Sequence, residues 1–341
     1  MSGIEQAWYQ GAKWLKLLRP FSFLAEKYAS SKRQAFLSQP DLEPFIALSG
    51  HSVPLIVVGN ISVGGTGKTP FTIALAQYLS SKGKRVGVVS RGYGSKRKTF
   101  PYEVLSESTT DDAGDEPLLI KQRLDCPVVI DPDRVSAVNF LLSKHDVDVL
   151  ISDDGLQHYK MNRSLEIVLV DGGRGLGNGR MLPEGPLRES VARLDSVDFV
   201  VVNSPAEGFP ELEGSERWAD WFKQNAYTQM SIVPGDFYSL ANDQQEVITG
   251  EQVYAVSGIG NPERFYNTLT EMRVKYLARP FRDHHDFSML DFVEMVDYRI
   301  AMTEKDAVKC RSLDLGNAVY LSVNASLEER FFDRVFDQLF T

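Results

Sequence analysis

The feature that most constrains this chain is a glycine-rich turn between an apolar run and an amphipathic stretch, within residues 55–79. Four apolar residues at 55–58 predict a buried strand, and apolar residues at helical spacing after the turn predict a helix that Gly83 ends. The turn between them is Ser62-Val63-Gly64-Gly65-Thr66-Gly67-Lys68-Thr69. Strand, glycine turn and helix in this order are the context that a phosphate-binding loop requires.

The residue types in this turn suit a nucleoside triphosphate. Its three glycines let backbone N–H groups converge on an anion, and the helix N-terminus adds its positive end. Lys68 is then expected to reach the β- and γ-phosphates, and the Thr69 hydroxyl to ligate Mg²⁺. Ser62 replaces the first glycine of the usual pattern G-x-x-x-x-G-K-[ST]. Because G-G-T-G-K-T is intact, we predict that residues 62–69 bind ATP or GTP.

Composition limits the class of protein. A chain of 341 residues is long enough for about two domains with cores of their own. The net charge of −9 argues against nucleic acid as a partner. Cys126 and Cys310 lie far apart without metal-ligand spacing, which suits a reducing compartment. No apolar run reaches the roughly 18 residues of a spanning helix. We therefore expect a cytosolic protein, or one on the inner face of a membrane.

Apolar strands continue to alternate with helices after the turn, which predicts an α/β fold. We expect a phosphate-loop domain over residues 38–226, in which helices cover both faces of a sheet. A second, smaller α/β domain is expected over 227–341. The further strands and the helix expected in the first of these domains cover residues 85–90, 128–130, 147–152 and 197–202, and 133–144.

Acidic residues follow two elements of the predicted first domain. Asp153 and Asp154 end an apolar strand, a pattern typical of the carboxylate that holds Mg²⁺ downstream of a phosphate loop. Asp115 and Glu116 open a predicted helix. Two interpretations of this second pair remain open. Asp115 either caps the helix, or lies at the edge of the sheet and accepts a proton from an attacking hydroxyl.

Basic residues gather in a long loop over residues 171–188, which contains six glycines and two prolines. A loop of this length without regular structure is more often functional than not. Four arginines of the chain are candidates for binding a phosphate on an acceptor: Arg134, Arg174, Arg180 and Arg188.

Two adjacent histidines lie between aspartates in F-R-D-H-H-D-F, residues 281–287. Adjacent side chains rarely point the same way, and no third His or Cys is nearby, so a metal site is disfavoured. A simpler role pairs one of the two, His284 or His285, with a carboxylate, in a loop that can swing toward the nucleotide domain. T-E-K-D at 303–306 lacks the intervening residue of the guanine-binding pattern N-K-x-D, so it is poor evidence for GTP.

Residues 4–37 combine aromatic and leucine side chains with lysine and arginine. Pro20 is expected to divide them into two amphipathic helices, which form a separate unit over residues 1–37. One interpretation places these helices on a membrane surface. The other packs them against the chain's own domain, with the lysines in solvent. The segment is basic within an acidic protein, which keeps the membrane interpretation open.

The chain resembles the tetraacyldisaccharide 4′-kinase (lipid A 4′-kinase) family of Gram-negative bacteria over nearly its whole length. Seven motifs occur in that family's order: S-V-G-G-T-G-K-T-P, S-R-G-Y-G, G-D-E-P, D-D-G-L-Q-H, G-P-L-R-E, R-D-H-H-x-F and T-E-K-D-A-V-K. D-D-G-L-Q-H and the D-H-H loop are not shared with other phosphate-loop proteins, and Ser62 is the family's own deviation. Glu184 stands where the family is expected to have a small residue.

The resemblance implies a kinase at the cytoplasmic face of the bacterial inner membrane. Such a kinase transfers the γ-phosphate of ATP to the 4′-hydroxyl of a tetraacylated glucosamine disaccharide 1-phosphate. It also implies that the smaller C-terminal domain hinges over the nucleotide.

The family's site residues can be carried over by motif. Lys68 and Thr69 then serve the phosphates and Mg²⁺, and the D-D pair at 153–154 serves the metal. Asp115 of G-D-E-P acts as the base. A histidine of the D-H-H loop orients it, and we expect His284, which directly follows the aspartate of the motif.

Other classes of protein use similar loops. Dimerising ATPases of the form K-G-G-x-G-K-[ST] carry an extra lysine that acts across the dimer, but Val63 occupies that position here. A GTPase switch, or a scaffold whose nucleotide is purely structural, is a further alternative. The sequence predicts no particular oligomeric state.

Overall fold

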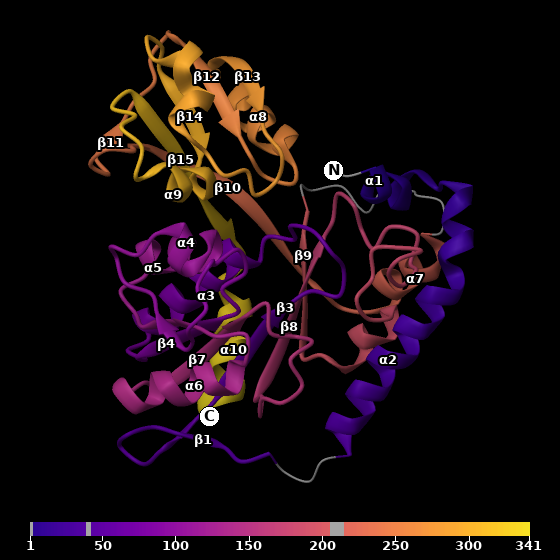
Figure 1. Ribbon diagram of the computed structural model, residues 1–341. Helices are drawn as coiled ribbons and strands as arrows, with labels where there is room; N and C mark the ends of the chain where they lie inside the picture. Colours follow the sequence, from indigo (N-terminus) through magenta and orange to yellow (C-terminus); the bar gives the residue numbers. More distant parts are fainter. Residues whose placement is uncertain (1–2, 39–41, 205–214) are drawn as a thin grey trace.

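Two stacked units share one continuous sheet in the computed structural model, which describes residues 3–38, 42–204 and 215–341. Figure 1 shows the larger unit below and the smaller one above, with β10 (Thr228–Ser239) running between them. The sheet has 13 strands, and β11 (Gln245–Glu246) pairs with β10 beside the main path. The main path is β13 (Lys275–Pro280), β12 (Gln252–Ser257), β14 (Ile300–Thr303), β15 (Ala318–Ser326), β10, β9 (Phe199–Asn203), β8 (Leu165–Asp171), β3 (Leu55–Gly59), β7 (Val149–Asp153), β4 (Val86–Ser90), β6 (Val128–Ile130) and β5 (Tyr102–Glu103).

The larger unit is a sandwich of helices around a parallel sheet. From β9 to β6 every neighbouring pair of strands is parallel. Its central strands are buried along their whole length, which is why they appear in the sequence as continuous apolar runs. One face packs on α3 (Lys68–Ser81) and α5 (Asp115–Arg123), and the other on α6 (Arg134–Lys144) and α7 (Glu216–Gln224). This confirms the predicted α/β class and its phosphate-loop sandwich.

The chain's last helix, α10 (Glu329–Phe340), returns to the larger unit. Phe331 and Phe332 of α10 contact the ring of Phe71 on α3, with centroid distances of 5.9 and 6.4 Å. The core beneath α3 therefore includes residues from the far end of the chain. The division of the chain between residues 226 and 227 stays a prediction. β9 before this point and β10 after it are neighbours in one sheet, and α10 from the end of the chain packs on the larger unit.

The smaller unit repeats the strand–helix–strand pattern. β13, β12, β14 and β15 are parallel neighbours, and β10 runs antiparallel to β15. α8 (Pro262–Glu271) covers one face, whereas α9 (Glu304–Cys310) and the 3₁₀ helix η3 (Met289–Met295) cover the other. As a result, α9 lies at the junction with α5 of the larger unit.

The N-terminal segment contains a helix boundary next to Pro20, as expected, and a second one that was not predicted. α1 (Gly3–Gln10) ends before Gly11, which has a positive φ of 67°, and the 3₁₀ helix η1 (Lys13–Leu18) follows. The long helix α2 (Arg19–Leu37) begins directly after η1, and Pro20 lies in its first turn, where no N–H is needed. The remaining short elements are β1 (Phe45–Ile46), β2 (Ser52–Val53), α4 (Thr110–Ala113) and η2 (Val191–Ser196).

Candidate active site

The predicted phosphate-binding loop joins the C-terminal end of β3 to the N-terminus of α3. Gly67 precedes the helix with a φ of +91°, a left-handed conformation that favours glycine. Several contacts hold the loop, among them a hydrogen bond from Asn203 Nδ2 to the carbonyl oxygen of Thr66 at 3.2 Å and one from Val63 N to that of Pro186 at 2.9 Å. The backbone N–H groups in the first turn of α3, from Lys68 onward, therefore face a loop whose conformation is fixed by these hydrogen bonds.

Lys68 lies among charged side chains from the residue after β7 and from the loop over 171–188. Its Nζ is 3.5 Å from Asp154 Oδ1, and Arg188 NH1 lies 3.3 Å from the other oxygen of the same carboxylate. Burial acts to raise the pKa of Asp154, but Lys68 and Arg188 outweigh it, so this pKa lies below its usual value. The structure therefore brings together two predicted site residues, Lys68 and Asp154, with one of the candidate arginines.

Asp153 is buried at the end of β7, directly before Asp154. Thr72 Oγ1 donates to its Oδ1 at 3.3 Å, whereas its buried Oδ2 has no hydrogen-bond partner. Burial, followed by the nearby carboxylates of Glu116 and Asp154, raises its pKa to about 7. An unpartnered buried carboxylate oxygen suits a hard cation. Within the described part of the chain, no three His, Cys, Asp or Glu side chains form a metal cage by themselves.

Asp115 is the first residue of α5 and is buried beside the loop that follows β4. Gly114 before it has a φ of +81°, and a Cβ there would lie 2.1 Å from the carbonyl oxygen of Tyr93. Only glycine fits this approach, so the G of G-D-E-P places Asp115 close to the S-R-G-Y-G loop. Asp115 is not the N-cap of α5, because Gly114 occupies that position and Asp115 is the first residue of the helix.

His284 and Asp115 meet across the two units. His284 Nδ1 lies 3.0 Å from Asp115 Oδ2, and the ring of Tyr93 packs edge-on against the imidazole at 5.4 Å. Burial acts to raise the pKa of Asp115, but His284 and the lysines Lys305 and Lys309 lower it to about 2. His285 instead faces Asp291, at 3.3 Å, and stacks on Phe281. The structure thus shows that His284, and not His285, contacts Asp115, a choice for which the sequence offers little basis.

Comparison with known proteins shows which family this chain is similar to. The family described as "Tetraacyldisaccharide-1-P 4'-kinase" matches residues 14–341. A protein named tetraacyldisaccharide 4'-kinase from Legionella pneumophila (strain Lens) is 43% identical over 97% of this chain and 95% of its own length. One of the same name from Pseudomonas fluorescens (strain Pf0-1) is 44% identical, over 94% of this chain and 90% of its own.

The chain belongs to the tetraacyldisaccharide-1-phosphate 4′-kinase family.

A solved structure shares the fold. The crystal structure of LpxK from Aquifex aeolicus in complex with ATP matches with a TM-score of 0.76 and 28% identity, over 96% of this chain and 99% of its own.

The four candidate arginines have different surroundings in this member of the 4′-kinase family. Arg174 NH2 donates to the carbonyl oxygen of Gly65 at 2.7 Å, so this side chain supports the phosphate-binding loop itself. Arg134 is buried, with NH1 donating to the carbonyl oxygen of Asp131 at 3.1 Å. Arg188 pairs with Asp154, as described above. Arg180 points elsewhere and lines a separate pocket.

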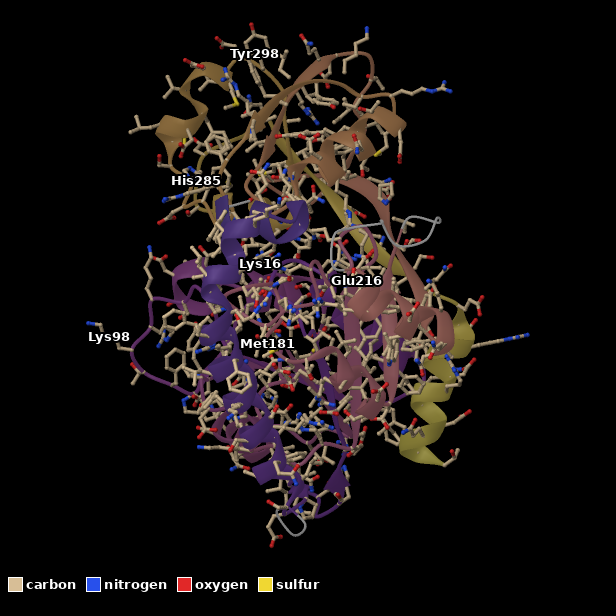
Figure 2. The ribbon with its side chains drawn as sticks, turned by 90° about the vertical axis from the view of Figure 1, so that its right-hand side faces the viewer. Lys16, Lys98, Met181, Glu216, His285 and Tyr298 are labelled. Atoms are coloured by element: carbon tan, nitrogen blue, oxygen red, sulfur yellow. The ribbon has the colours of Figure 1, made fainter. Side chains whose placement is uncertain are left out.

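That separate pocket has a volume of about 320 Å³ and lies between η1, the loop over 171–188 and α7. Figure 2 shows Lys16 and Glu216 near each other at this place. Glu184 is buried there and pairs with Arg19 at 2.9 Å and with Arg180 at 3.8 Å. The basic side chains that line the pocket are Lys13, Lys16, Arg19, Arg180 and Arg217. We refer to this set as the basic pocket.

The outer surface of η1 and α2 carries large apolar side chains in solvent. Leu17 is 78% exposed and Tyr28 70%. Trp14, Phe21, Phe23 and Leu24 are also exposed on these helices. No described helix has the length and apolar character needed to cross a membrane. Trp8 and Leu15 on the inner side pack near Val63 of the phosphate-binding loop, so the segment is both docked on its domain and apolar outside.

Two site residues were not predicted as functional. Glu116 follows Asp115 on α5, and its pKa is lowered because Lys305 and Lys68 outweigh its burial. Lys305 of the T-E-K-D motif lies 3.0 Å from Glu116 Oε1. The T-E-K-D motif contains Lys305, but no sequence pattern indicates that α9 packs on α5.

Proposed function

We propose that the transfer of the γ-phosphate of ATP to the 4′-hydroxyl of tetraacyldisaccharide 1-phosphate takes place at the edge of the sheet between β3, β7 and α5. The loop over 62–69 holds the triphosphate with its backbone N–H groups, and Lys68 neutralises charge on the β- and γ-phosphates. Asp115 accepts the proton of the attacking hydroxyl, and His284 orients Asp115. Phosphoryl transfer needs mainly positioning and charge neutralisation, which these groups provide.

The observation that carries this proposal is the contact between His284 and Asp115, whose atoms Nδ1 and Oδ2 lie 3.0 Å apart. Asp115 begins α5, at the edge of the sheet that also carries the phosphate-binding loop. A carboxylate held by a second side chain next to a phosphate site is what a hydroxyl acceptor requires. A nucleotide switch or a scaffold has no need of such a pair.

Mg²⁺ fits the carboxylates of β7. The unpartnered oxygen of Asp153 supports this assignment, and Asp154 and the Thr69 hydroxyl complete the proposed ligand set. When bound, Mg²⁺ supplies positive charge next to the β- and γ-phosphate oxygens.

We also propose that the acceptor reaches the site from a membrane surface. The exposed apolar side chains of η1 and α2 contact the lipid, with lysines and arginines between them, as in interfacial helices. Because ATP is available inside the cell, the surface is the cytoplasmic face of the inner membrane. The 1-phosphate of the acceptor binds in the basic pocket, near Lys16 and Arg180.

The test of this function is ATP consumption with and without the lipid disaccharide. The proposal predicts turnover that depends on the lipid and on Mg²⁺. Turnover at the same rate without the lipid would indicate an ATPase and contradict the proposal.

A further inference from the structure

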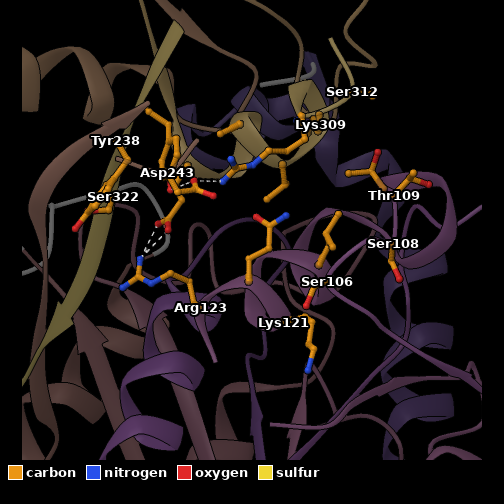
Figure 3. Close-up of a pocket in the computed structure, with 18 of the residues that line it drawn as sticks. Ser106, Ser108, Thr109, Lys121, Arg123, Tyr238, Asp243, Lys309, Ser312 and Ser322 are labelled. Atoms are coloured by element: carbon orange, nitrogen blue, oxygen red, sulfur yellow. Dashed lines mark hydrogen bonds and ion pairs between the residues drawn. The ribbon is translucent and has the colours of Figure 1, made fainter. Parts of the chain in front are cut away.

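The T-E-K-D segment begins α9, which packs on α5 at the junction of the two units. Charged residues face each other along these helices. Arg123 at the end of α5 pairs with Glu304 at 2.7 Å, and Lys305 pairs with Glu116 at 3.0 Å. Figure 3 shows a cavity at this junction, of about 840 Å³, which side chains of both units line, Arg123 and Lys309 among them. The Lys305 pair lies at the other end, next to the proposed base.

Lys305 contacts the proposed base as well as its neighbour. Its Nζ lies 3.8 Å from Asp115 Oδ2, the same oxygen that His284 contacts at 3.0 Å. Lys309 Nζ is 4.0 Å from this oxygen but lies closer to Asp306, at 2.9 Å. Among the described residues, the basic side chains within 4.0 Å of Asp115 are His284, Lys305 and Lys309; all three belong to the smaller unit, and their contacts are with Oδ2.

The second oxygen of Asp115 has a different environment. Within the described parts of the chain, Oδ1 makes no hydrogen bond or ion pair, and it is not among the buried polar atoms that lack a partner. An oxygen that is open and unpaired can accept a proton, whereas the paired oxygen holds the carboxylate in place.

Lys305 remains charged in this environment. Its side chain is 24% exposed, and burial acts to lower its pKa. The carboxylates of Glu116 and Asp115 outweigh this and raise the pKa above its usual value. An ammonium group between two carboxylates of α5 fixes the start of that helix relative to the smaller unit.

We propose that Lys305 is a positioning residue for phosphoryl transfer. It binds Glu116 and the Oδ2 side of Asp115, so that Oδ1 points to the acceptor hydroxyl when the smaller unit lies against α5. This inference rests on the proposed role of Asp115 as the base. It adds that the T-E-K-D motif aligns this base from the other unit.

The first test compares Lys305→Met with Arg123→Met. Both variants remove an ion pair between α5 and α9, but only Lys305 contacts Asp115. Lys305→Met is expected to lower kcat about 10- to 100-fold, the cost of a misplaced reacting group, with the KM values for ATP and for the lipid within about twofold. Arg123→Met is expected to retain most of kcat. Equal losses in both variants would overturn the inference. Lys305→Arg retains the charge and should recover part of the rate.

The second test separates positioning from a direct effect on the phosphates. In an Asp115→Asn background, Lys305→Met should cause little further loss of kcat, because its role runs through Asp115. Losses that multiply would show that Lys305 acts independently, and would overturn the inference.

Thermal unfolding of each variant shows that it is folded. A wild-type enzyme that transfers phosphate, together with a fully active Lys305→Met variant, refutes only this inference. A wild type without transfer refutes the proposed function.

Discussion

His284 Nδ1 lies 3.0 Å from Asp115 Oδ2, although the two residues belong to different units of the fold. Asp115 begins a helix of the larger unit, and His284 lies in a loop of the smaller one with a φ of +55°. The pair therefore joins a loop of the smaller unit to α5, and neither unit alone contains it.

Removing the proposed base should affect chemistry more than binding. We expect Asp115→Asn to lower kcat by ~10²–10⁴, since general base catalysis contributes this much. The binding of ATP should remain close to that of the wild type. Steady-state kinetics with ATP titration checks both. Asp111→Asn is a matched control, because Asp111 is a largely exposed carboxylate nearby on α4. A kcat close to that of the wild type in Asp115→Asn would leave Asp115 without a catalytic role.

The burial of Asp153 predicts a pH dependence of stability in metal-free protein. Its pKa is about 7 in the folded state and about 3.9 in the unfolded state. The folded state therefore binds the proton more tightly, and this contribution to stability is lost as the pH rises from about 4 through 7. Asp153→Asn lacks this loss. Its Tm relative to that of the wild type should rise between pH 5 and pH 8, as measured by calorimetry with a chelator.

Asp148→Asn is the control for this experiment. Arg85 holds the pKa of Asp148 at about 2, below its unfolded value, so its contribution is present above about pH 4 and is lost only in acid. The Tm difference between this variant and the wild type should be constant from pH 5 to pH 8. The same constant difference for Asp153→Asn would show that Asp153 ionises as easily in the folded state as in the unfolded state.

The basic pocket contains Lys16, which we expect to recognise only the 1-phosphate end of the acceptor. Lys16→Ala should raise the KM for tetraacyldisaccharide 1-phosphate about two- to fivefold, the range for one exposed ion pair. It should leave unchanged the KM for an analogue without the 1-phosphate. Lys27→Ala, a lysine of α2 outside the pocket, is the control. An equal rise in KM for both acceptors would point to the phosphates of membrane lipids instead.

The exposed apolar side chains predict how the enzyme reaches its lipid. Leu17→Ser with Phe21→Ser should weaken binding to phosphatidylglycerol vesicles about tenfold or more, because each side chain loses apolar area buried in the interface. Co-sedimentation with vesicles measures this. Val247→Ser alters an equally exposed apolar residue of the smaller unit and should bind as the wild type does. Retained binding in the double variant would assign these side chains no role at the membrane.

Local patterns predicted the elements around the nucleotide site well. β3 and β7 are buried on both faces, so they appear as continuous apolar runs, and the glycine turn between β3 and α3 has its own signature. The expected helix at residues 133–144 is α6, which begins at Arg134 with Asp133 as its cap. Buried strands, glycine turns and helix caps each depend on residues that are close together in the sequence, so a local pattern can predict them.

Contacts between distant segments could not be predicted in the same way. Lys305 and Glu116 are 189 residues apart, and their pairing depends on how α9 packs on α5. The choice between His284 and His285 follows from the conformation of the loop, because His285 stacks on Phe281 and turns away from Asp115. Only the family resemblance favoured His284 in advance. The return of α10 to the core beneath α3 likewise has no local signal.

The most direct test of the account follows the γ-phosphate itself. The enzyme is incubated with γ-³²P-labelled ATP and Mg²⁺, and with an acceptor whose 4′-hydroxyl is either free or methylated. The account predicts that label passes into the lipid only when the hydroxyl is free, and that Asp115→Asn slows this transfer. Label released as inorganic phosphate at equal rates with both acceptors, and none in the lipid, would contradict it.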